Sequence, residues 1–173
     1  MFAKDAYILN VRALPTGESK EEYLLTKSLF DRFENDDITA CDVKCEAKID
    51  RTEREISINF TFNGTITVAC DRCLEPIDIK ISSDEYLVLK FGQAVEIEDE
   101  NVVMLSEKET VFDLSQFFFE CVLVGKPFRC VHGEADESKC DESMIALIEC
   151  QNKQKEKDNE ETDPRWAALK KLK

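Results

Sequence analysis

The chain has 173 residues, a length that suits one domain with a short additional segment. Its 37 acidic residues outweigh 23 lysines and arginines, and the formal net charge of −14 argues against binding nucleic acid by phosphate neutralisation over the whole surface. Any contact with RNA or DNA must therefore be local. The composition is that of a soluble globular protein, and no segment approaches the roughly 18 apolar residues of a membrane span.

The N-terminus, from Met1 to Leu14, lacks the basic start, the apolar stretch and the cleavage site of a secretory signal. We therefore expect a cytoplasmic protein. In that reducing compartment the eight cysteines are expected to be thiols or metal ligands, whereas disulfides would be expected only if the protein were secreted.

Two periodicities organise the first half of the chain. Apolar residues at every fourth position predict a short amphipathic helix over Thr26–Glu34. Alternating polarity over Cys41–Phe91 predicts an antiparallel meander, with Asp71–Pro76 as a turn between strands. Asn63-Gly64 within this run is ordinarily a hairpin signal, although the unbroken alternation around it also allows a bulge or bend in one long strand.

The second half has mainly helical patterns. After the acidic stretch Glu96–Glu100, expected to be a solvated loop, and a short apolar run, Asp113 can cap a helix with a buried stripe at helical spacing. A second short helix is predicted over Asp141–Glu149. The following segment, Gln151–Thr162, has almost no apolar residues and is either a solvated helix extension or a flexible linker.

These elements predict an α+β fold, in which an antiparallel β-meander is packed with a few helices and followed by an extended basic C-terminal tail. The expected organisation is a single α+β domain over residues 1–150, a polar linker or helix extension over 151–162, and a basic amphipathic segment over 163–173.

A Cys-x-x-Cys motif is the sharpest chemical signal, because two thiolates three positions apart in a turn can share one Zn²⁺. Cys70 and Cys73 form this motif, and a polar segment downstream contains Cys130, His132 and Cys140. Cys70, Cys73, His132 and Cys140 would make a closed four-ligand site, in which Cys130 could replace either downstream ligand. The alternative is that Cys70 and Cys73 are turn and core thiols and that His132 is solvated. The expected cofactor is therefore either none or one structural zinc.

The remaining cysteines and acids offer little basis for an enzyme. Cys41, Cys45 and Cys121 lie on predicted apolar faces and are expected to be core thiols, and Cys150 is assigned no role. Thioredoxin-like motifs lie at a strand-to-helix junction, whereas this Cys-x-x-Cys lies between strands. One histidine, no nucleophile elbow and no glycine-rich phosphate loop predict that the protein is not an enzyme.

The last eleven residues reverse the charge of the chain, with a net charge of +3. Trp166, Leu169 and Leu172 can form an apolar stripe beside basic residues, either as a docking helix for a protein groove or RNA surface or as a helix packed on its own body. The long polar stretch before this segment favours docking. The residues expected to contact a partner are Arg72, Arg165, Trp166, Lys170, Lys171 and Lys173.

Three blocks in a fixed order resemble a known family. They are Cys70–Pro76; Phe112-Asp113-Leu114 followed by Glu120, Lys126-Pro127, Val131-His132 and Cys140; and Asp163–Leu172. Together they resemble the YceD family, the large ribosomal RNA subunit accumulation proteins. This chain departs from many members in lacking a second compact cysteine pair after Pro127.

The resemblance implies a non-enzymatic ribosome-assembly factor that supports accumulation or processing of large-subunit (23S) rRNA. The implied partners are the large ribosomal subunit precursor, through rRNA, basic ribosomal proteins or both, with no membrane and no small-molecule substrate. A small zinc-binding module for nucleic acid or protein is the alternative, and it predicts stoichiometric metal and unfolding with a chelator. A thiol–disulfide redox protein is a further alternative and predicts a depressed thiol pKa at Cys70 or Cys73.

Overall fold

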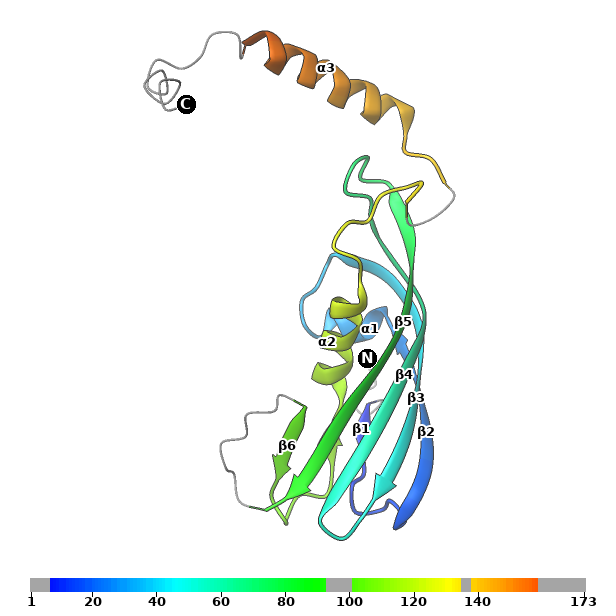
Figure 1. Ribbon diagram of the computed structural model, residues 1–173, viewed down its shortest axis with the longest axis vertical. Helices are drawn as coiled ribbons and strands as arrows, with labels where there is room; N and C mark the ends of the chain where they lie inside the picture. The colour runs from blue at the N-terminus through cyan, green and yellow to red at the C-terminus, as the bar shows by residue number, and fades with distance from the viewer. Residues whose placement is uncertain (1–6, 93–100, 135–137, 159–173) are drawn as a thin grey trace, which may run out of the picture.

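The computed structural model describes residues 7–92, 101–134 and 138–158, and its body is a five-stranded sheet in the order β2-β3-β4-β5-β6 (Figure 1). Neighbouring strands from β2 to β5 are antiparallel, and β6 pairs in parallel with β5. The α+β class predicted from the sequence is confirmed, with the meander extended by one parallel strand. The five strands are β2 (Gly17–Thr26), β3 (Ile38–Arg51), β4 (Glu55–Ala69), β5 (Pro76–Phe91) and β6 (Val102–Leu105).

Short elements complete the body. The strands β1 (Ile8–Leu9) and β7 (Phe112–Asp113) form a separate antiparallel pair. The helices α1 (Lys27–Asp31) and α2 (Ser115–Gly125) lie against one face of the sheet, whereas α3 (Glu142–Asp158) projects beyond the end of the sheet that bears the β4–β5 turn (Figure 1). Within the described residues, no helix combines the length and apolarity needed to cross a membrane.

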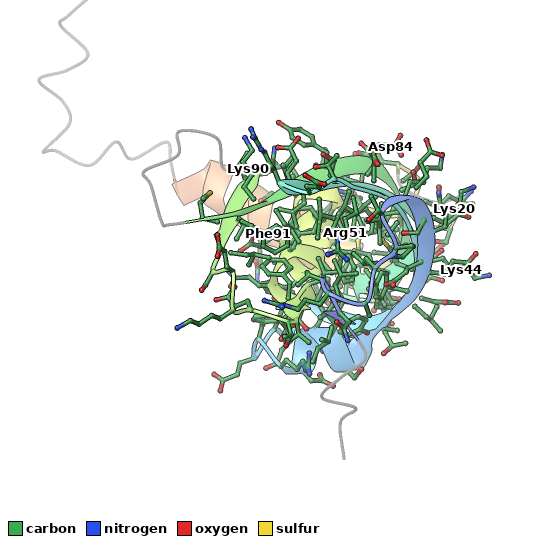
Figure 2. The ribbon with its side chains drawn as sticks, turned by 90° about the horizontal axis from the view of Figure 1, so that it is seen from below. Lys20, Lys44, Arg51, Asp84, Lys90 and Phe91 are labelled. Carbon is green, nitrogen blue, oxygen red and sulfur yellow. The ribbon has the colours of Figure 1, made fainter. Side chains whose placement is uncertain are left out.

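The sheet follows from the alternation in the sequence, because successive side chains of a strand point to opposite faces. Most inward positions of β3, β4 and β5 are apolar and buried on the face that α1 and α2 cover, whereas Ser83 and Glu85 of β5 are polar and half-buried. The outward positions are polar, and Figure 2 shows Lys20, Lys44 and Asp84 pointing away from the body. One face is therefore packed and one is solvated, as an antiparallel meander allows.

The packed face centres on Phe118 of α2, which is fully buried. Its ring makes edge contacts with Tyr7, Phe60 and Phe62, at centroid distances of 5.8, 5.5 and 5.8 Å. The N-cap residue of this helix is Leu114 and not the predicted Asp113, although the Asp113 carboxylate accepts a hydrogen bond from the backbone N–H of Ser115, the first helical residue, at 2.8 Å. One helix thus joins the N-terminal segment to the middle of the sheet.

The structure corrects one expectation about local structure and decides between two alternatives for another. The predicted helix over Thr26–Glu34 is shorter, because helical residues run only from Lys27 to Asp31 and Thr26 closes the edge strand β2, which the sequence did not indicate. Asn63-Gly64 is not a hairpin: it lies inside β4, and Gly64 pairs with Val43 in unbroken register. Pairing on both sides overrides the turn preference of this dipeptide, so the long-strand alternative holds.

The C-terminal helix is longer than the predicted Asp141–Glu149. It continues from Glu142 to Asp158, so the extension alternative for the polar segment holds as far as Asp158. The acidic stretch Glu96–Glu100 and residues 159–173 lie outside the described part of the chain.

Candidate metal centre

The first half of the site is the turn between β4 and β5, which contains Cys70 and Cys73. Two backbone hydrogen bonds close this turn: the Cys70 N–H donates to the Glu75 carbonyl and the Leu74 N–H to the Cys70 carbonyl, both at 2.9 Å. Leu74 adopts a left-handed conformation (φ +65°), which favours glycine. The buried thiols of Cys70 and Cys73 are thus held by a tightly bonded turn.

The second half is the segment after α2, which lies beside this turn. The Asp71 N–H donates to the Cys130 carbonyl at 2.8 Å, and the Cys130 N–H donates to the Asp71 carboxylate at 2.6 Å. Two residues further on, His132 places Nε2 at 3.2 Å from the Pro76 carbonyl. Because Nε2 faces this carbonyl oxygen, Nδ1 on the other side of the ring faces the cysteines.

Four ligand atoms converge where the two halves meet. The Sγ atoms of Cys70, Cys73 and Cys140 and a ring nitrogen of His132 all lie within 4.8 Å of one another. Cys70 Sγ is 3.9 Å from Cys140 Sγ, and Cys73 Sγ is 3.3 Å from His132 Nδ1. Three sulfurs and one imidazole are a donor set suited to a closed, tetrahedral zinc site.

The environment of Cys70 favours a thiolate. Burial opposes ionisation, but hydrogen bonds from backbone N–H groups of Cys73, His132 and Arg72 outweigh it and lower the pKa of Cys70 to about 6. The Arg72 N–H lies 3.4 Å from the sulfur. This turn therefore offers a charged sulfur near neutral pH, the form in which cysteine binds a metal.

The structure brings Cys70, Cys73, His132 and Cys140 together and leaves Cys130 outside the cluster. Cys130 is buried, and its thiol donates to the Pro127 carbonyl at 3.5 Å. The side chain of Arg72 is exposed at the turn. The other residues expected to contact a partner, Arg165, Trp166, Lys170, Lys171 and Lys173, lie outside the described residues.

Sequence reasoning missed two groups that position the cluster. Asp71 fastens the segment after α2, and the carbonyl of Pro76 orients His132. The sequence offered only the position of Asp71 between the two cysteines as a signal. A backbone carbonyl has no sequence signature, because every residue contributes one.

The other cysteines differ from the cluster in their surroundings. Burial raises the pKa of Cys41 to about 11 and those of Cys45 and Cys121 to about 12, so these thiols stay protonated near neutral pH. Their packing in or against the core agrees with the expected role of core thiols. Cys150 is exposed on α3.

A hollow at the other end of the sheet is a different kind of feature. It is lined by Arg12, Arg51, Glu53, Phe91 and Glu107, and Figure 2 labels Arg51 and Phe91 there. The Arg51 guanidinium donates to the carbonyls of Arg12, at 3.2 Å, and Leu14. These contacts fasten the N-terminal segment to β3 and give the arginine a structural role.

The sequence of this chain matches a known family. A family model described as large ribosomal RNA subunit accumulation protein YceD matches residues 58–173. The chain belongs to the YceD family. No curated protein and no solved structure gives a significant match. The matched part of this YceD chain begins in β4 and includes all four residues of the cluster.

The bridge between the turn and the downstream segment gives a first prediction for this YceD protein. Replacing Asp71 by alanine removes the acceptor of the Cys130 N–H, and we expect a loss of about 1–2 kcal/mol in the free energy of unfolding, since a hydrogen bond to a charged group is lost at a solvated position. Urea unfolding measures this change, and hydrogen exchange should show faster exchange of the Cys130 amide.

Asp78→Ala is the matched control. Asp78 is also exposed and accepts one short hydrogen bond, from Thr67 Oγ1 at 2.6 Å, but it only joins neighbouring strands. The Cys130 amide should keep its protection in this control. Equal protection of that amide in both variants would contradict a positioning role for Asp71.

Proposed function

We propose that this chain is a non-enzymatic ribosome-assembly factor that supports accumulation or processing of 23S rRNA by binding the large-subunit precursor in the cytoplasm. The family match over residues 58–173 carries this proposal, because the family is described by the accumulation of large-subunit ribosomal RNA and not by a reaction. The match includes the metal-binding candidate residues and the basic terminal segment, so it covers the regions that the sequence marked as functional.

The charge distribution of the chain supports contacts with two kinds of partner through different parts of the chain. The net charge of −14 suits contact with basic ribosomal proteins, whereas the last eleven residues, with a net charge of +3, suit a local contact with rRNA. We assign the rRNA contact to Arg72, Arg165, Trp166, Lys170, Lys171 and Lys173.

A small zinc-binding interaction module is the second candidate function. The cluster of three thiols and one imidazole favours it, because such closed sites commonly hold small recognition domains together. The two functions are compatible, since a module of this kind can act within an assembling ribosome.

Depletion of the protein in its own host tests the assembly role. We expect a selective fall in large-subunit rRNA relative to small-subunit rRNA, because loss of an assembly factor exposes unassembled rRNA to degradation. Quantification of both rRNAs, together with sucrose-gradient profiles of the subunits, measures this ratio. Normal profiles with an unchanged ratio would refute the proposal.

Rescue of the depleted strain tests the terminal segment. A chain carrying Lys170→Glu and Lys171→Glu should bind precursor particles more weakly, because two phosphate contacts are lost. The affinity of this chain should also depend less on salt concentration. A chain carrying Lys44→Glu and Lys48→Glu, two exposed lysines on the outer face of β3, is the control with the same charge change. Equal rescue and equal co-sedimentation by both chains would remove the terminal segment from the interface.

A further inference from the structure

Two distances in the cluster fit a tetrahedral metal site. A tetrahedral site with Zn–S bonds of about 2.3 Å and a Zn–N bond of about 2.0 Å separates two sulfurs by about 3.8 Å and a sulfur from a nitrogen by about 3.5 Å. The observed separations of 3.9 Å for Cys70 and Cys140, and 3.3 Å for Cys73 and His132, are close to these values. A disulfide would need about 2.0 Å between two sulfurs.

The surrounding protein supplies what a metal ligand set requires. The imidazole of His132 has its second nitrogen beside a backbone carbonyl, the arrangement that fixes the tautomer of a metal-binding histidine. Cys70 receives a backbone N–H from Arg72, which stabilises a thiolate. Without a metal, the cluster would consist of three free cysteines beside one histidine. Two of these cysteines are buried.

The second pair of ligands is unusual in its spacing. Most compact zinc sites have two to five residues between the ligands of the second pair, whereas seven residues lie between His132 and Cys140. Cys140 directly precedes Asp141, whose carboxylate accepts the N–H of Met144 at 3.1 Å and caps α3. The fourth ligand therefore lies at the beginning of α3.

In the described residues, this part of the chain also meets the body through other contacts. Asp71 fastens Cys130, the Pro76 carbonyl meets His132, and Met144 of α3 packs partly buried against the core. Over residues 142–152 of α3 most side chains are exposed, including Leu147. A metal bond at Cys140 would thus link the residue just before Asp141 and α3 directly to the turn between β4 and β5.

We propose that Cys70, Cys73, His132 and Cys140 bind one structural Zn²⁺, and that this ion fastens the beginning of α3 to the turn between β4 and β5. The proposal rests on the second candidate function, the zinc-binding module, and does not depend on the ribosomal role. Binding displaces the thiol protons to solvent and changes no oxidation state, so three thiolates and one neutral imidazole surround the ion.

Metal analysis of the full chain, purified without chelator, tests the site. We expect about one Zn²⁺ per chain, and a loss of most of that zinc in Cys73→Ser and in Cys140→Ser. Cys130→Ser and Cys150→Ser are matched controls, because one residue is buried outside the cluster and the other is exposed on α3. Both controls should keep the full zinc content.

A second measurement uses the unaltered chain, so it tests the site even if the variants fail to fold. The unaltered chain, reconstituted with Co²⁺, should show the intense visible bands of a tetrahedral thiolate site. Treatment with a chelator should then make the chain between α2 and α3 sensitive to protease, while the strands stay resistant.

Three results would overturn the proposal. One is a folded, metal-free chain that takes up no Co²⁺. Another is a disulfide between two of these cysteines in the native protein, found by mass spectrometry. The third is zinc that is retained by Cys140→Ser but lost by Cys130→Ser. Unchanged protease sensitivity after complete removal of zinc would refute the anchoring of α3.

Discussion

Replacement of Phe118 by alanine is expected to lower the free energy of unfolding by about 3–5 kcal/mol, because the change removes a fully buried ring and leaves a cavity. The effect falls at the upper end for a core residue, since Phe118 contacts rings from the N-terminal segment, from β2 and from β4. Urea unfolding followed by circular dichroism measures the change, and the melting temperature should fall by roughly 10 °C.

Phe128→Ala is the control for the loss of a ring. Phe128 follows the same helix but is fully exposed, so its replacement should change stability by less than about 0.5 kcal/mol. Phe118→Leu should lie between the two, because leucine fills part of the cavity. A Phe118→Ala chain as stable as the Phe128→Ala chain would show that α2 does not pack on the sheet as described.

Replacement of Gly64 by alanine is expected to destabilise the sheet by about 2–3 kcal/mol. A Cβ atom at this position would lie 2.2 Å from the Asp42 carbonyl oxygen and 2.5 Å from the Val43 Cα, and both atoms belong to the backbone of β3. Backbone atoms in the middle of a paired strand cannot rotate away, so β3 and β4 must separate. Chemical unfolding gives the size of the loss.

Gly125→Ala provides the comparison. A Cβ atom at Gly125, the last residue of α2, would make an ordinary contact of 3.6 Å with Ile81. Stability should stay the same or rise by up to about 1 kcal/mol, because alanine restricts the unfolded chain. Similar stabilities for the two alanine variants would exclude a close approach of β3 and β4 at Gly64.

Periodicity predicted the sheet because its strands have one buried and one solvated face. The alternation over Cys41–Phe91 marks β3, β4 and β5 correctly, and the same rule indicated that Asn63-Gly64 could lie within a strand. The alternation did not predict the edge strand β2, because most of its side chains are polar or half-exposed and only Leu25 is fully buried. Pairing with β3, which no local pattern encodes, defines that strand.

The cluster was predictable in its members but not in its geometry. The Cys-x-x-Cys motif and the single histidine indicated Cys70, Cys73 and His132, and the sequence named Cys140 as the fourth ligand with Cys130 as its substitute. The Asp71 bridge distinguishes the two, because it uses the backbone of Cys130 and leaves its thiol directed to Pro127. A contact between segments about sixty residues apart lies beyond any local pattern.

The small ladder between β1 and β7 has a consequence for the order in which the protein folds. It joins Ile8 to Asp113 and Leu9 to Phe112, positions about a hundred residues apart, whereas β2 to β5 pair with neighbours in sequence. The chain entropy lost in closing so long a loop cannot be recovered by a two-residue ladder alone. The strand β1 is therefore expected to pair late in folding, after the meander and α2 have formed the surface on which it packs.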